Sequence, residues 1–170
     1  MSWLSFAGLS AVLALPAGAA PHAAAPDLAF APSQCGYAVS FPGQPAISQS
    51  TAVDGGTNAA ADLVYGGVRF SAACLAAAPG RPAAPLAAAD VAGRLAEMTH
   101  ALGVQNAQIH PLPKLGPGCG EVDGVLGDKA QPYKIQARIC IAANATFIAE
   151  TIARTDDAAA RKFLDSLVPK

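Results

Sequence analysis

Charge is the first thing this 170-residue sequence has little of. Charged residues make up 14% of the chain, with 11 Lys or Arg and 12 Asp or Glu, and the formal net charge is −1 at pH 7. Proteins that bind nucleic acid or an anionic membrane surface normally carry a strong positive field. No run of residues here is basic enough to supply one, so we expect neither kind of partner.

An apolar run long enough to cross a membrane, roughly 20 residues, is also missing. The run Trp3–Leu15 instead has the length of the apolar part of a secretory signal peptide. The small residues at 17–20 offer cleavage contexts, although no Lys or Arg precedes the run. We predict a signal peptide over 1–20, cleaved near 19–25, and a disordered Ala/Pro-rich arm over 21–34. A single domain over 35–170 would then be periplasmic or secreted, with no membrane span left.

Several motifs of catalysis and metal binding are missing as well. There is no Cys-x-x-Cys, no closely spaced pair of zinc ligands, no G-x-S-x-G and no S-x-x-K. The glycine-rich residues 116–120 precede a strand-like segment, whereas a phosphate cradle opens a helix. No helical spacing brings His100 and His110 together. The sequence therefore predicts no catalytic site, no metal site and no cofactor.

What the sequence does contain is alternating polarity and two helical periodicities. The segments with strand character are 36–41, 46–53, 62–77, 133–141 and 145–154, the third bent at Gly66-Gly67. Residues 86–102 and 156–168 have helical spacing, and 107–118 looks extended or irregular because of its prolines. This pattern predicts an α+β fold in which two amphipathic helices cover an antiparallel sheet, stapled by disulfides.

The hairpin register predicts the first disulfide. If residues 119–126 fold back on 133–140 with Leu126 opposite Tyr133, Cys119 falls opposite Cys140. The same register places apolar residues together on one face and sets Glu121 opposite Arg138 on the outer face. Directly opposed cysteines have nearly the separation that a disulfide needs. We therefore predict a Cys119–Cys140 bond.

The second disulfide, Cys35–Cys74, follows only by elimination. Four cysteines allow three connectivities, and export to an oxidising compartment favours full pairing. A simple meander of the first strands would place Cys35 and Cys74 at opposite ends of the sheet. Either those strands do not form a meander or the pairing differs.

Three carboxylates and one histidine are the candidate site residues. Glu121 and Asp123 share one face of a strand, and His110 lies in the proline-rich segment. Glu150 would point to the core if Ile148 and Ile152 do, and a buried carboxylate with a raised pKa would be a functional candidate. If Phe147, Ala149 and Ala153 form the core face, Glu150 is solvated, and this is the arrangement we expect.

Short motifs link the chain to a known type of protein. CGYAVSFPGQP at 35–45 with its FPGQP turn, a middle helix, paired late strands and KFLDSL at 162–167 occur together. In this the chain resembles small secreted bacterial domains and, more loosely, the PsbP-like α/β/α sandwich. The resemblance implies a helix-covered antiparallel sheet and accessory or binding roles more often than catalysis. It assigns no functional residue, because the motifs are structural.

Three functions are consistent with these observations. The first, which we favour, is a non-catalytic envelope protein that binds a small ligand or another envelope protein, or helps to assemble one. The second is a small hydrolase or lyase that uses Glu121, Asp123 or Glu150, and it requires a cleft where two carboxylates converge. The third is a secreted enzyme inhibitor that inserts the loop 112–120, stiffened by its prolines.

Overall fold

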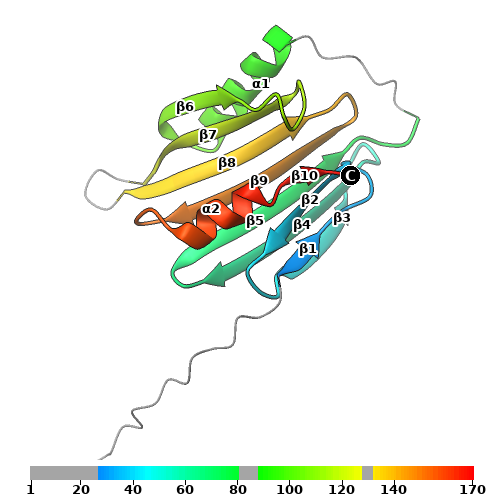
Figure 1. The fold of residues 1–170 in the computed structure, drawn as a ribbon. Helices are drawn as coiled ribbons and strands as arrows, with labels where there is room; N and C mark the ends of the chain where they lie inside the picture. Colours follow the sequence, from blue (N-terminus) through cyan, green and yellow to red (C-terminus); the bar gives the residue numbers. More distant parts are fainter. Residues whose placement is uncertain (1–26, 81–87, 128–131) are drawn as a thin grey trace, which may run out of the picture.

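The computed structural model describes residues 27–80, 88–127 and 132–170, and about half of these residues are in strands. They form ten strands in two antiparallel sheets, together with two short helices (Figure 1). The elements in chain order are β1 (Leu28–Phe30), β2 (Tyr37–Phe41), β3 (Ala46–Thr51), β4 (Thr57–Tyr65), β5 (Val68–Ala76), α1 (Ala88–Ala101), β6 (Gln105–Pro111), β7 (Cys119–Leu126), β8 (Tyr133–Ile141), β9 (Ala145–Ala153), α2 (Ala158–Asp165) and β10 (Val168–Pro169).

The prediction of an α+β fold with a sheet covered by two amphipathic helices is wrong, because the protein is mostly β. The bend expected at Gly66-Gly67 is a hairpin turn that separates β4 from β5. Both glycines have positive φ, 59° and 81°, which a two-residue hairpin turn of this hand requires. In the proline-rich stretch, β6 pairs with β7 as far as Pro111. Leu28–Phe30, placed by us in a disordered arm, form β1 and pair with β2.

The large sheet has the strand order β3-β4-β5-β9-β8-β7-β6, and both of its faces are partly covered. One face, called here the α2 face, packs against α2 and the small sheet β1-β2-β10 (Figure 1). The other, the α1 face, is covered by α1 at the β6–β7 end. Cover is therefore supplied by one helix and a second sheet on one side and by a single helix on the other.

The main core lies between the large sheet and α2. The ring of Phe163 in α2 makes edge contacts with Phe41 at 4.9 Å and with Phe70 at 5.4 Å between centroids. The helical spacing of 156–168 predicts a buried face made of Ala160, Phe163, Leu164 and Leu167, and all four are buried. Asp157 caps the helix, since its Oδ1 accepts hydrogen bonds from the backbone N–H groups of Ala159 (2.7 Å) and Ala160 (3.1 Å).

A smaller core lies under α1, the helix predicted over 86–102, of which 86 and 87 are outside the described residues. Val91 and Leu95 pack on apolar residues of β7 and β8, among them Val122 and Ile139. Gly120 permits this close approach, because a Cβ there would lie 2.8 Å from Cδ1 of Leu95. The helical spacing predicts one face with Val91, Leu95, Met98 and Leu102. The first three pack in this core, whereas Leu102 follows the end of α1 and is exposed.

Both disulfides are present with the expected connectivity. The predicted hairpin register is confirmed, with Cys119 opposite Cys140 and a Cα–Cα distance of 4.1 Å. Cys35 bonds to Cys74 at a Cα–Cα distance of 5.9 Å. The first strands do not form a meander, because β2 leaves the large sheet and pairs with β1 and β10 instead. Cys35, just before β2, therefore lies above Cys74 of β5 and cross-links the two layers.

Candidate functional site

Three of the four candidate residues lie on the α2 face of the large sheet. His110 of β6 lies opposite Glu121 of β7, and Asp123 lies two residues further along β7, opposite Gln136 of β8. Glu150 of β9 lies opposite Ala137, on the α1 face. The sheet thus separates Glu150 from the other two carboxylates.

Glu121 belongs to an ion-pair network beneath the C-terminal end of α2. Its Oε2 accepts from Nε of Arg138 at 2.7 Å and its Oε1 accepts from Nη1 of Arg161 at 3.0 Å. The side chains of Glu121 and Arg138 are only 13% and 12% exposed, so this pair does not lie on an open outer face as we expected. Burial alone would raise the pKa of Glu121, but the hydrogen bonds and charges of the two arginines lower it below its ordinary value.

The same arginine also anchors the end of α2. Nη1 of Arg138 donates to the backbone oxygen of Leu164 at 2.6 Å, and Nη2 pairs with Asp165 at 2.6 Å. A cation at this position satisfies a carbonyl of the last helical turn and complements the negative end of the helix dipole. Glu121 and Arg138 are therefore engaged in holding α2 on the sheet, which leaves little chemistry free at Glu121.

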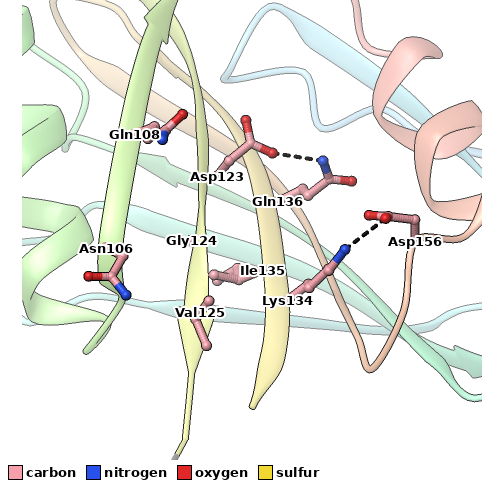
Figure 2. A pocket seen from close by; sticks show the side chains of 9 residues that line it. All are labelled: Asn106, Gln108, Asp123, Gly124, Val125, Lys134, Ile135, Gln136 and Asp156. Carbon is pink, nitrogen blue, oxygen red and sulfur yellow. Dashed lines mark hydrogen bonds and ion pairs between the residues drawn. The ribbon is translucent and has the colours of Figure 1, made fainter. Parts of the chain in front are cut away.

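Next to this network a pocket of about 290 Å³ opens on β6, β7 and β8 (Figure 2). Asp156, just before α2, closes one side of it. The lining residues are Asn106, Gln108, Asp123, Gly124, Val125, Lys134, Ile135, Gln136 and Asp156. Two interactions join lining residues to each other. Nε2 of Gln136 donates to Asp123 at 2.7 Å, and Nζ of Lys134 pairs with Asp156 at 2.7 Å. The pocket is polar, and most of its charge is already paired.

The wall formed by β6 differs from the rest of the pocket. A β-bulge interrupts the β6–β7 register between Gln105 and Gln108, and Asn106 within it has a φ of 53°. Positive φ is uncommon for residues other than glycine, and bulges often redirect side chains beside binding or active sites. No hydrogen bond to the described residues engages the side-chain amide of Asn106 or Gln108, and Figure 2 shows both beside the pocket. These two amides are free to bind a ligand.

Sequence reasoning missed this pocket, although one residue signals it. Gly124 lies in β7 directly behind the bulge. A Cβ there would collide with Cγ1 of Val104 and would lie 3.1 Å from the backbone oxygen of Gln105. A glycine inside a strand often marks a bulge or the close approach of another backbone segment. The bulge itself has no composition signature, which is why the pattern of 105–111 did not reveal it.

Glu150 is placed differently from both arrangements considered from sequence. Phe147, Ala149 and Ala153 are buried in the main core, yet Glu150 on the opposite face is half-buried, not fully solvated. Burial raises the pKa of Glu150, the positive charge of Arg69 partly opposes this, and the negative charge of Asp62 adds to it. Asp62 itself accepts from Ser71 Oγ at 2.6 Å and from Arg69 Nη2 at 2.9 Å. Glu150 is thus a half-buried carboxyl group beside the ion pair of Asp62 and Arg69.

This arrangement predicts that Glu150→Gln modestly stabilises the protein at neutral pH. The raised pKa means that the ionised form is disfavoured by folding, so the cost is complete above the folded pKa and vanishes below the unfolded pKa. Thermal unfolding at neutral and acid pH measures the difference. Asp62→Asn is the matched control and should destabilise at neutral pH, because hydrogen bonds from Ser71 and Arg69 lower the pKa of Asp62 despite its burial. A loss of stability at neutral pH in Glu150→Gln would contradict the argument.

The described parts of the chain contain no cluster of side chains that could bind a metal ion. No three His, Cys, Asp or Glu side chains within residues 27–80, 88–127 and 132–170 lie close enough together to hold an ion. His110 and His100 are both exposed, on β6 and α1 respectively. The pocket of amides and paired charges is therefore the best candidate site in the described structure.

No known protein family and no curated protein matches this chain. The resemblance to PsbP-like domains accordingly stays a prediction. Neither α1 nor α2 is long and apolar enough to cross a bilayer, and the described residues contain no other candidate span.

Proposed function

We propose that the protein is an exported, non-catalytic binding module that holds a small polar ligand in the pocket on β6–β8. The observation that carries this proposal is the pair of unengaged amides, Asn106 and Gln108, on one wall of a pocket whose other polar groups are mutually paired. An amide can donate and accept at once, so two of them orient a ligand that carries both kinds of group. A few placed polar groups of this kind are what fix a ligand in a pocket.

Export is supported by the cysteines and the proposed leader. All four cysteines are paired in two disulfides, which persist in the periplasm or outside the cell and are rare in the cytosol. The predicted signal peptide over 1–20 lies outside the described residues. A periplasmic or secreted location is therefore part of the proposal.

The two alternatives receive less support from the geometry. A carboxylate-based hydrolase needs two acids converging on one substrate, whereas Glu150 lies on the opposite face of the sheet from Glu121 and Asp123. On the shared face, Glu121 is held by two arginines and Asp123 accepts a hydrogen bond from Gln136. An inhibitory loop should project freely, whereas Leu112 and Leu115 in the loop 112–120 pack against the main core. The hydroxyl of Tyr37 also donates to the backbone oxygen of Leu115 at 3.2 Å.

Binding can be tested by nuclear magnetic resonance with a panel of monosaccharides, free amino acids and dicarboxylates. We expect at least one of these probes to shift the backbone amide signals of Asn106, Gln108 and Gln136. Asn106→Gly combined with Gln108→Ala should weaken that binding roughly tenfold or more, since each lost hydrogen bond is worth about 0.5–1.5 kcal/mol. Glycine keeps the positive φ at position 106, so the bulge is retained.

Ser48→Ala, on the distant edge strand β3, is the control and should leave binding unchanged. Shifts confined to the α1 face, or no shift with any probe, would show that this pocket is not the ligand site. Equal binding by the double variant and the wild type would also refute the assignment.

A further inference from the structure

Strand β3 is one edge of the large sheet, and within its six residues there is no charge, proline or bulge to protect that edge. All six residues, AISQST, are exposed and none is charged. The register with β4 runs without interruption from Ala46–Asp62 to Thr51–Thr57, so the strand is not bent by a bulge. No described strand pairs with its outer side. Long, uncharged, regular edges are templates for pairing with another strand.

The opposite edge, β6, shows what protection looks like in the same protein. It contains the bulge at Asn106, which disrupts its ladder, and it ends at Pro111, which cannot donate. The two edges of one sheet therefore differ: one has features that prevent strand addition, and the other is left regular and neutral.

The backbone groups that β3 presents outward can be derived from its turn. The N–H of Ala52 donates to the oxygen of Gly56 at 2.9 Å, in the same register as the β3–β4 ladder. In an antiparallel ladder, residues that bond to the partner strand alternate with residues whose N–H and C=O point away. Ala46, Ser48 and Ser50 therefore bond to β4. The outward groups belong to the next set, Ile47, Gln49 and Thr51.

We infer that two copies of this chain associate through β3, antiparallel and about a two-fold axis at Gln49. The three outward residues are symmetric about Gln49, so Gln49 pairs with its own copy and Ile47 pairs with Thr51 of the other. Each of these pairs exchanges both of its hydrogen bonds, which satisfies every outward group of the strand. An isologous arrangement of this kind closes on itself and yields a dimer, not a fibre.

Side chains at this edge favour a second copy as the occupant. Two exposed apolar residues, Ile47 (57% exposed) and Val53 at the β3–β4 turn, lie at this edge. The two-fold register sets Ile47 of one copy opposite Thr51 of the other, so each Ile47 gains a cross-strand neighbour and loses exposed apolar surface. No charge in β3 opposes its own copy across the axis. A six-residue strand pair buries less than a standard interface, so the dimer is weak and depends on protein concentration.

Sedimentation velocity of the purified protein over a range of concentrations is the test, together with amide hydrogen exchange. We expect a monomer–dimer equilibrium, and at high concentration slower exchange of the N–H groups of Ile47, Gln49 and Thr51. Gln49→Pro should raise the dimer dissociation constant roughly tenfold or more, because two hydrogen bonds across the axis are lost. Its N–H faces away from β4, so the β3–β4 ladder keeps its bonds and the unfolding temperature of the dilute protein should be unchanged.

Two further variants keep the test decisive if the proline disturbs folding. Gln49→Lys sets like charges directly opposite each other, and its dimer should be weaker at low salt than at high salt. Gln49→Thr keeps the N–H and should dimerise like the wild type. A monomer at every concentration would overturn the inference, and so would a dimer that persists in both Gln49→Pro and Gln49→Lys. Protection of β3 only when another protein is added would assign the edge to a different partner and also overturn it.

Discussion

Arg138→Met is expected to lower the free energy of unfolding by about 3–5 kcal/mol, the range for breaking a buried ion pair by removing one partner. Arg138 is 12% exposed and donates to Glu121, to the backbone oxygen of Leu164 and to Asp165. Without it, Glu121 retains only Arg161, and the Leu164 carbonyl loses its side-chain donor. Equilibrium unfolding in urea, without reducing agent, measures the loss.

Arg161→Met is the matched control, because it removes the second cation of the same carboxylate. The side chain of Arg161 is 46% exposed, so its loss should cost less than about 1 kcal/mol. Adding Glu121→Met to Arg138→Met should recover part of the stability, since the uncompensated buried charge is then removed. Equal losses in the two arginine variants would contradict a buried network centred on Arg138.

The same network predicts the direction of a pH effect. The pKa of Glu121 is lower in the folded protein than in the unfolded chain, so its contribution is complete above the unfolded pKa. The contribution is then lost as the pH falls through the folded pKa. The stability difference between the wild type and Arg138→Met should therefore shrink at acid pH.

The hairpin of β7 and β8 could be predicted from sequence because several independent features agree on one register. Two cysteines, one ion pair and an apolar face all require Cys119 opposite Cys140, and a slip by one residue would break every one of them. Helix α2 could be predicted equally well, because Ala160, Phe163 and Leu164 have the spacing of one helix face and follow a capping aspartate. Local patterns of this kind determine the elements that they span.

The layering could not be predicted in the same way. Alternation reveals which residues share a face, but both faces of the large sheet are partly covered here, so apolar residues occupy both sides. In β9, Phe147 packs in the main core, while its neighbour Ile148 packs on the α1 side. The sequence of this strand therefore does not show which of its two faces lies against the main core. The departure of β2 into the small sheet depends on two pairings. One is with β1, in a segment that composition predicts to be disordered, and the other is with β10, which is distant in sequence.

The candidate site was hidden for a related reason. Its free amides, Asn106 and Gln108, are ordinary polar residues, and the bulge that lies beside the pocket at this point of β6 has no signature in the composition. The carboxylates that looked reactive, Glu121 above all, are the ones that the fold uses to hold α2 in place. Charged residues in a sequence poor in charge were thus better indicators of architecture than of chemistry.

Loss of the Cys35–Cys74 bond should destabilise the protein more than loss of Cys119–Cys140. The first joins residues 39 apart and the second joins residues 21 apart, so the first restricts the unfolded chain more. The chain-entropy relation gives about 4 kcal/mol for the first and about 3.4 kcal/mol for the second. Cys35→Ala with Cys74→Ala, and Cys119→Ala with Cys140→Ala, are compared by equilibrium unfolding in urea.

The two disulfides also differ in what they connect. Cys119 and Cys140 are opposed within one hairpin whose eight paired positions would hold the strands together without the bond. Cys35 instead ties the small sheet to β5, and the layers are otherwise joined largely by side-chain packing. We therefore expect the Cys35/Cys74 variant to expose the main core first, with binding of a hydrophobic dye before the β7–β8 amides lose protection from exchange. A larger loss for the Cys119/Cys140 variant, or simultaneous loss of protection throughout the sheet, would show that the layer cross-link has no such separate role.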